Sequence, residues 1–141
     1  MNKEVFGDYI DRFNKRDATT FEDYIHPNAR IQNGSLLIKG MQGMKDHYVK
    51  VWGGYTEELH VERFVSDEHT AAIEMLAHFT ATKDDDKSIF GPILAGETFD
   101  SHSVIIYRIE NGLFTDIKIG SIGRVKTSLK GEKIDVGQAH K

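Results

Sequence analysis

The hydrophobic pattern of this chain changes its period at Tyr55. Before that residue, apolar side chains recur mainly at helical spacing, whereas after it they alternate with polar side chains over long stretches. This change predicts helices in the first part of the chain and long strands in the second. We therefore expect an α+β domain whose helices gather on one face of an antiparallel sheet.

Three helices and one short strand are expected before Tyr55. The first helix has an apolar stripe that includes Val5, Tyr9 and Phe13, and Asp17 can cap the second. Pro27 ends the second helix because proline cannot continue it. The expected ranges are residues 5–16, 17–25 and 41–52 for the helices and 29–33 for the strand.

Four long strands are expected after the change of period. They cover residues 55–66, 70–82, 97–109 and 113–122, and Asn111-Gly112 is a typical hairpin turn. Long twisted strands make a sheet curl. A curled sheet closed by helices leaves a cavity between the two, which is a usual position for a small ligand. The expected fold is a cone-shaped barrel, a curved antiparallel sheet wrapped around three N-terminal helices.

Composition excludes several classes of protein. A chain of 141 residues is one domain by default, and it has no cysteine, which excludes disulfides and zinc–cysteine sites. The net charge of −4 argues against a nucleic-acid partner. The start of the sequence has no apolar run behind basic residues, and no segment is long enough to cross a membrane. We expect a cytoplasmic protein with neither a nucleic-acid nor a membrane partner.

The last residues differ in charge from the rest. Residues 123–141 contain five Lys or Arg and two Asp or Glu, whereas the body of the chain is acidic. We expect a single domain over residues 1–122 and a basic extension over 123–141. The extension is either a solvated end or a strap that lies on the acidic body or on a partner subunit.

The order and spacing of the expected elements over residues 5–122 resemble a known superfamily. Its members include nuclear transport factor 2, ketosteroid isomerase, scytalone dehydratase, limonene epoxide hydrolase and the SnoaL-like polyketide cyclases. The resemblance implies the fold of nuclear transport factor 2 with a SnoaL-like domain. Since this fold carries many chemistries and also non-enzymes, the resemblance implies less about function.

Two mechanisms of the superfamily do not carry over. Tyr9 falls at the position of the oxyanion-hole tyrosine of ketosteroid isomerase, but Asn33 replaces its general base and Ile105 its second oxyanion donor. An amide cannot accept that proton and an isoleucine cannot donate one. The catalytic residues of the epoxide hydrolases are replaced too, by Met75, Ala77 and Ile119.

Scytalone dehydratase gives a partial match. His60 falls near its first pocket histidine, and His78 falls near the second in one strand register. Ser101 and Ser103 fall on its hydrogen-bonding positions. Phe13 and Asn33 replace its two tyrosines.

His60 is the first choice for a general acid or base, because imidazole titrates near neutral pH. The alternative is a surface histidine on an edge strand. His78 shares strand parity with carboxylates and is either catalytic or part of a polar patch on the outer face of the sheet. Tyr9 and Asn33 complete the catalytic candidates, although Tyr9 could also be simple core packing.

The remaining pocket residues are expected to bind substrate without reacting. They are Phe13, His47, Tyr48, Trp52, Met75, Phe90, Ser101, Ser103, Ile105 and Ile119. A mainly apolar pocket with few polar points suits a hydrophobic oxygenated molecule, such as a polyketide or terpenoid of secondary metabolism. We expect a cofactor-independent isomerase, cyclase or dehydratase that uses histidine-assisted proton transfer, with no metal. The alternative is a non-catalytic module of the same fold that binds a small molecule or a partner.

Two further expectations concern surfaces. Leu76, Val104 and Ile106 share one strand parity and predict an apolar stripe on the outer face of the sheet, as at a homodimer interface. The loop over residues 83–96 is long and carries Phe90 among other apolar side chains. It is either a lid at the mouth of the pocket or an arm that packs on the partner subunit.

Overall fold

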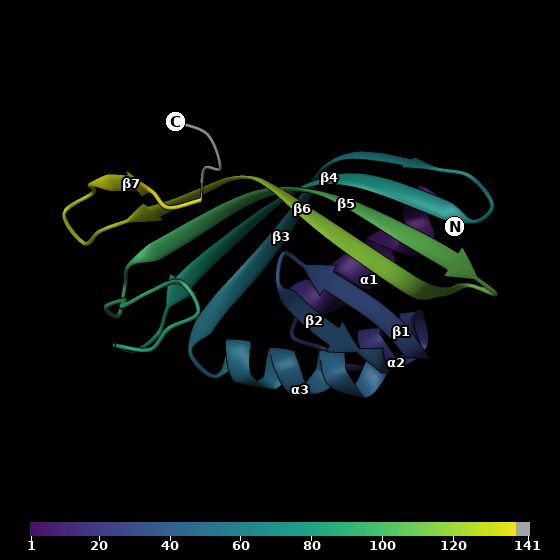
Figure 1. Ribbon diagram of the computed structural model, residues 1–141, viewed down its shortest axis with the longest axis horizontal. Helices are drawn as coiled ribbons and strands as arrows, with labels where there is room; N and C mark the ends of the chain where they lie inside the picture. The colour runs from purple at the N-terminus through teal and green to yellow at the C-terminus, as the bar shows by residue number, and fades with distance from the viewer. Residues whose placement is uncertain (138–141) are drawn as a thin grey trace.

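The computed structural model describes residues 1–137, and its elements appear in the expected order (Figure 1). The helices are α1 (Lys3–Asn14), α2 (Thr19–Tyr24) and α3 (Gly40–Trp52). The strands are β1 (Ile25–Asn33), β2 (Leu36–Lys39), β3 (Tyr55–Ser66), β4 (Thr70–Ala81), β5 (Thr98–Glu110), β6 (Leu113–Thr127) and β7 (Lys133–Asp135).

The helices form where the sequence supplies caps and an apolar stripe. The Asn2 side chain accepts a hydrogen bond from the Val5 amide at 2.8 Å and caps α1. The buried stripe of α1 then faces the sheet, with Phe6 and Phe13 each 1% exposed. At the start of α3, Gly40 is required: its φ is +72°, and a Cβ there would lie 2.1 Å from the Pro27 carbonyl oxygen.

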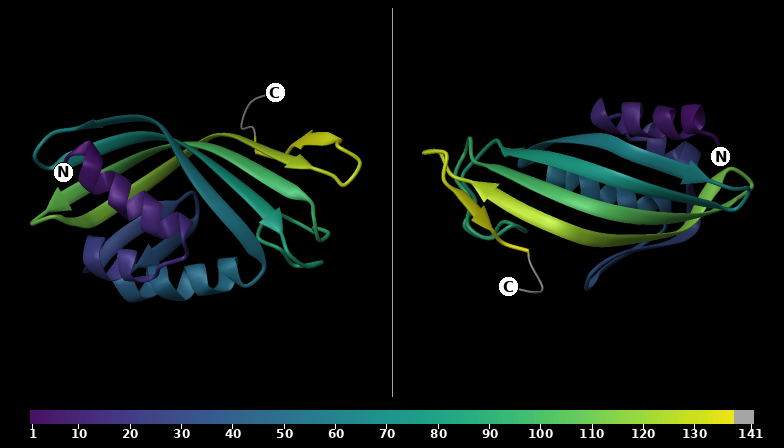
Figure 2. Two further views of the ribbon diagram at one scale, coloured as in Figure 1. Left: turned by 180° about the vertical axis from the view of Figure 1, so that it is seen from behind. Right: turned by 90° about the horizontal axis from the view of Figure 1, so that it is seen from above.

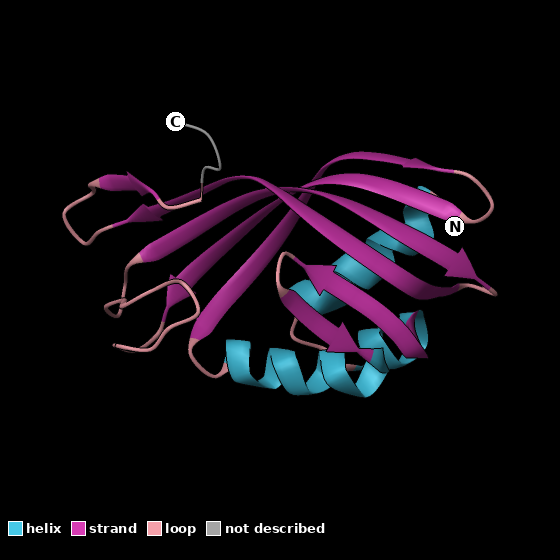
Figure 3. Cartoon of the chain, viewed as in Figure 1, coloured by secondary structure: helices cyan, strands magenta, loops and turns pink. Residues whose placement is uncertain are grey.

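The strands form one open sheet in the order β2-β1-β6-β5-β4-β3, and β7 pairs with the end of β6. The pairing is antiparallel except between β1 and β6, which run parallel. The sheet arches over the three helices, which all lie on its concave side (Figures 1 and 3). The expected α+β class with a curved antiparallel sheet is confirmed, and the sheet does not close into a complete barrel.

The core fills the space between the concave face and the helices. One buried cluster joins α1, α2 and the sheet through residues such as Phe6, Phe21 and Phe114. A second cluster lies where β3, β4 and β5 meet the long loop, around Phe79 and Phe99. The cavity described below lies between these two clusters and is bounded by residues of both.

Two of the β-bulges decide which side chains face the interior in β3 and in the second half of β6. In β3 the register shifts between Val61 and Arg63, which leaves Glu62 as an extra residue. In β6 the register shifts between Ser121 and Gly123, which leaves Ile122 extra. A bulge reverses the parity of all residues beyond it. Alternation alone could not locate either position.

Three strands differ from the sequence expectation. β2 and β7 are short and were not expected, and β6 extends to Thr127 instead of ending at Ile122. A domain boundary drawn after Ile122 therefore falls inside β6. The chain beyond Gly123 joins the sheet at least as far as β7, which lies at the same end of the molecule as the loop of residues 83–96 (Figure 2). None of the helices described is long and apolar enough to cross a membrane.

Candidate functional site

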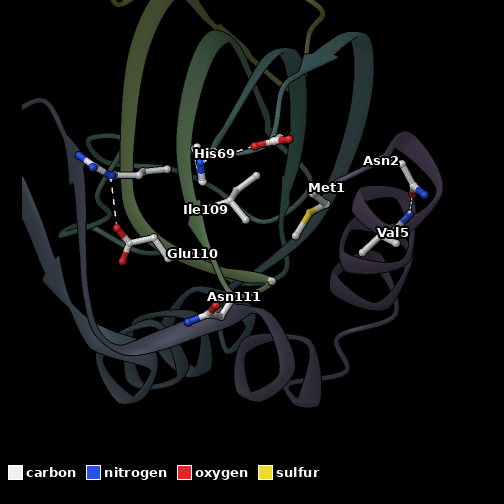
Figure 4. A pocket seen from close by; sticks show the side chains of 10 residues that line it. Met1, Asn2, Val5, His69, Ile109, Glu110 and Asn111 are labelled. Atoms are coloured by element: carbon white, nitrogen blue, oxygen red, sulfur yellow. Dashed lines mark hydrogen bonds and ion pairs between the residues drawn. The ribbon is translucent and has the colours of Figure 1, made fainter.

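Among the hollows formed by residues 1–137 are two with the size of a ligand site, and the larger of these two is the less suitable. It has a volume of about 760 Å³ and lies between the start of α1 and the turn after β5 (Figure 4). Its charged side chains pair with one another at the surface, Arg108 with Glu110 at 3.6 Å and His69 with Glu68 at 3.8 Å. Because these charged groups are exposed and already paired, they do not form a candidate catalytic site.

The second hollow is a cavity of about 580 Å³ between the concave face of the sheet, α1, α3 and the long loop. That volume is typical of a small-molecule pocket. Its walls are mainly apolar, with Ile31, Met75 and Ile105 among the side chains from the sheet. The polar side chains on its wall are Tyr9, Asn33, Ser35, His47, Tyr48, Glu57, Ser101, Ser103, Tyr107 and Arg124.

Glu57 is the buried carboxyl group of this cavity. It lies near the start of β3, shares the inward parity of Leu59, and is 7% exposed. Its Oε1 atom is fully enclosed and has no hydrogen-bond partner among residues 1–137. Burial without a cationic partner disfavours the ionised form and raises the pKa of Glu57 to about 8. Such a group can take up or release a proton close to neutral pH.

Three tyrosines line the same cavity as Glu57. Tyr9 comes from α1, Tyr48 from α3 and Tyr107 from β5, and within residues 1–137 none of their hydroxyls forms a hydrogen bond. Burial raises the pKa of each, and the charge of Glu57 raises the pKa of Tyr9 and Tyr48 further. All three are therefore neutral hydrogen-bond donors at physiological pH, available to an oxygen of a ligand.

His47 lies on the α3 side of the cavity. Burial, together with the charge of Lys50, lowers the pKa of this imidazole. His47 is consequently neutral at physiological pH and contributes a polar contact without a positive charge.

Two serines of β5 supply hydroxyls on the opposite wall. The Oγ atoms of Ser101 and Ser103 lie 3.3 Å apart, and Ser103 is buried. Asn33, at the end of β1, also lines the cavity. These three residues share the same hollow with Tyr9, as expected for a common site.

His60 and His78 lie outside the cavity, which corrects their expected placement. The His60 side chain is 73% exposed and its Nε2 atom lies 3.6 Å from Glu62. His78 is on the outer face, where its Nδ1 atom lies 2.6 Å from Asp100. Both residues have the opposite strand parity to the lining residues of β3 and β4, so neither imidazole can reach a ligand in this cavity.

Trp52 is also absent from the cavity wall. It stacks on Phe21 at a centroid distance of 5.9 Å and contacts Phe13 edge-on, so it supports the wall from behind. The other residues predicted to bind substrate do line the cavity: Phe13, His47, Tyr48, Met75, Phe90, Ser101, Ser103, Ile105 and Ile119.

The long loop covers one end of the cavity. Phe90 stacks on Phe99 at 4.0 Å and meets Phe79 edge-on at 4.8 Å, and Ile93 of the same loop is buried. Lys126 holds the loop from β6, since its Nζ atom donates to the Pro92 carbonyl at 2.7 Å. Phe90 therefore forms part of the rim of the cavity.

Sequence reasoning missed two charged residues of the site. Glu57 could have been found, because its parity with Leu59 and Val61 places a carboxylate among inward-facing apolar residues. Arg124 could not, because it reaches the inner face only through the bulge at Ile122. Within residues 1–137 no group of three His, Cys, Asp or Glu side chains could hold a metal ion.

Comparison with known proteins supports the resemblance. The SnoaL-like domain model matches residues 6–117. No curated protein matches significantly. Among solved structures, a SnoaL-like polyketide cyclase from Agrobacterium tumefaciens superposes with a TM-score of 0.68 at 16% identity, covering 86% of this chain and 92% of its own.

Other structural relatives have different descriptions. An epoxide hydrolase from M. tuberculosis, described as LEH-like, has a TM-score of 0.67 at 10% identity and covers 84% of this chain and 80% of its own. A protein of unknown function from Burkholderia pseudomallei, described as NTF2-like, has a TM-score of 0.67 at 13% identity, with coverages of 84% and 88%. At these identities the structures share the fold alone.

Proposed function

Because this chain belongs to the SnoaL-like family, we propose that it is a cofactor-independent enzyme that moves a proton on a hydrophobic, oxygenated small molecule. The reaction is an isomerisation, cyclisation or dehydration, and Glu57 is the group that carries the proton. The observation that carries the proposal is a buried carboxyl group that has no partner within residues 1–137, on the wall of a cavity that three tyrosines also line.

Glu57 acts as the general base in this proposal. A carboxylate with a pKa of about 8 is a stronger base than an ordinary glutamate, and it is still partly ionised at neutral pH. The apolar surroundings that raise its pKa also exclude the water that would otherwise solvate the carboxylate. The base then removes a proton from a carbon next to a carbonyl group.

The tyrosine hydroxyls stabilise the charge that develops on the substrate. Removal of such a proton leaves an enolate, whose negative charge lies mainly on oxygen. Neutral donors placed around a cavity in advance stabilise that oxygen more in the transition state than in the ground state. Tyr9 and Tyr48 are suited to this role because both lie close enough to Glu57 for its charge to affect their pKa.

The apolar walls determine the class of substrate. A volume of about 580 Å³ with mainly Ile, Met, Phe and Leu side chains suits a polyketide or terpenoid skeleton. The description of the Agrobacterium tumefaciens relative as a polyketide cyclase agrees with this class.

Kemp elimination of 5-nitrobenzisoxazole tests the general base without knowledge of the natural substrate. The base removes the C3 proton, the N–O bond breaks, and the released cyanonitrophenolate is coloured. We expect kcat/KM to rise with an apparent pKa of about 8 and then to level off. Glu57→Gln is expected to lower kcat by roughly 10²-fold or more.

The neighbouring Glu58 provides the matched control. Its side chain is exposed on the outer face of the same strand, so Glu58→Gln should leave the rate unchanged. Equal rates for wild type and Glu57→Gln would exclude Glu57 as the base. If the wild-type protein binds the probe but does not turn it over, the result favours the alternative of a non-catalytic binding module.

A further inference from the structure

Arg124 brings a positive charge to the cavity wall. The bulge at Ile122 reverses the parity of β6, so Arg124 and Lys126 follow Ile117 and Ile119 onto the inner face. Lys126 is engaged with Glu97 at 3.6 Å and with the long loop. Arg124 is thus the cation that faces the cavity among the residues described.

The stem of Arg124 is held in place by the segment after β7. The Val136 amide donates to the Arg124 carbonyl at 3.0 Å, and Gly137 packs directly on the side chain. A Cβ on Gly137 would lie 2.7 Å from the Cβ, Cγ and Cδ atoms of Arg124, so only glycine permits this contact. The chain beyond β6 therefore positions the arginine.

The guanidinium group retains unused donors. Its Nε atom donates to Ser121 at 3.2 Å, while no carboxylate within residues 1–137 forms an ion pair with it. Arg124 pairs across the ladder with Ser101, whose hydroxyl lies 3.3 Å from that of Ser103. A guanidinium fork beside two hydroxyls matches the donor pattern that a carboxylate accepts.

The distance between Glu57 and Arg124 determines the size of the ligand. The row that contains Glu57 runs through Phe79 and Phe99 to Lys126, which is two residues from Arg124. Three strand spacings are about 14 Å, and the curvature of the sheet brings the two side chains closer than their Cα atoms. A flat molecule of two or three rings spans that gap.

We propose that Arg124, with Ser101 and Ser103, binds a carboxylate or a comparably acidic oxygen at one end of the ligand, so that the natural ligand is a hydrophobic acid. This inference deepens the proposed function. It rests on that function only in assuming that the reacting carbon lies near Glu57. The segment after Gly123 is then part of the site, because it positions Arg124.

Calorimetric binding of two matched probes tests the proposal. Anthraquinone-2-carboxylate and anthraquinone-2-carboxamide have nearly the same shape and differ in charge. We expect wild-type protein to bind the acid about tenfold or more tightly than the amide. Arg124→Gln is expected to remove this preference, whereas Arg63→Gln, at a side chain 85% exposed on β3, should retain it.

The controls separate this proposal from the previous one. Binding needs no proton transfer, so the preference should persist in Glu57→Gln even though Kemp elimination is lost. A preference that survives in Arg124→Gln would overturn the proposal, as would equal binding of the two probes, or no binding of either, by wild type. In wild-type protein, the acid but not the amide is expected to shift the NMR resonance of the Arg124 Nε–H, and an unchanged resonance would overturn the proposal without relying on a variant.

Discussion

At the residue scale, the cost of burying Glu57 is the feature that stability measurements can detect. The pKa of Glu57 is about 8 in the folded protein, whereas it is near 4.5 in the unfolded chain. Between these values the folded state binds more protons than the unfolded state, so the contribution of Glu57 to stability falls as pH rises. Below about pH 4.5 the contribution is constant, because both states are protonated.

Glu57→Gln is therefore expected to gain stability relative to wild type as pH rises from 4.5 to 8. The difference in free energy of unfolding between the variant and wild type should grow by at most about 1.4 kcal/mol for each pH unit and then remain constant above pH 8. Urea unfolding at pH 4, 6 and 8 measures it. Glu58→Gln, at an exposed side chain, should show no such trend, and a pH-independent difference for Glu57→Gln would contradict a raised pKa.

Removing the charge of Glu57 and removing an aromatic side chain from the cavity wall have different effects on the protein. Within the part of the chain that the structure describes, Glu57 forms no ion pair, so its replacement by an amide of the same shape leaves the packing intact. The buried aromatic residues around the cavity, such as Phe13 and Phe79, instead maintain its shape through ring contacts. Chemistry and shape are carried by different residues of the same cavity.

At the element scale, the loop of residues 83–96 remains a proposed lid. Phe90 is held by aromatic contacts to Phe99, Phe79 and Tyr55, whereas Leu94 is 50% exposed and does not line the cavity. A side chain that covers the mouth excludes water from the ligand. The rest of the loop is tied down through Ile93 and Lys126.

Phe90→Ala is expected to raise KM for 5-nitrobenzisoxazole severalfold, with Leu94→Ala as the control in the same loop. Steady-state kinetics across both variants provides the measurement. Deletion of residues 85–94 should raise KM further or abolish turnover. If the deletion leaves the kinetics intact and produces a monomer, the loop is an arm on the partner subunit and not a lid.

The bulges in β3 and β6 have opposite consequences for the site. The bulge at Glu62 brings Phe64 to the core side of β3, where its ring lies 5.3 Å from Phe6, and leaves Val65 66% exposed. The bulge at Ile122 brings a charged residue, Arg124, to the cavity. One extra residue in a strand thus decides whether the following side chains face the core or the solvent.

At the scale of the whole molecule, the outer face of the sheet carries the expected apolar stripe. Leu76 is 38% exposed, Val104 43% and Ile106 51%. Paired polar groups surround them, with His102 2.7 Å from Glu74 and His78 2.6 Å from Asp100. An apolar centre with a polar rim is the usual composition of a protein interface, so the homodimer remains our proposal.

Sedimentation at micromolar concentration is expected to give twice the chain mass of 16.0 kDa. Val104→Glu should produce the monomer, because two-fold symmetry places the introduced charges on both sides of one interface. Val49→Glu makes the same substitution on α3, at a side chain 67% exposed, and should leave the dimer intact. A wild-type mass of one chain would contradict the proposal.

The sequence by itself determined the order of helices and strands, the position of most lining residues and the apolar outer stripe. Each depends on periodicity within a single segment, which neighbouring residues control. Strand parity would also have placed Glu57 inside and His60 outside, but the prediction followed the chemistry of histidine and chose His60. Only the tertiary structure decided the parallel pairing of β1 with β6, the bulges in β3 and β6 and the lack, within residues 1–137, of a charged partner for Glu57. Register and desolvation depend on residues distant in the sequence, and local alternation contains no information about them.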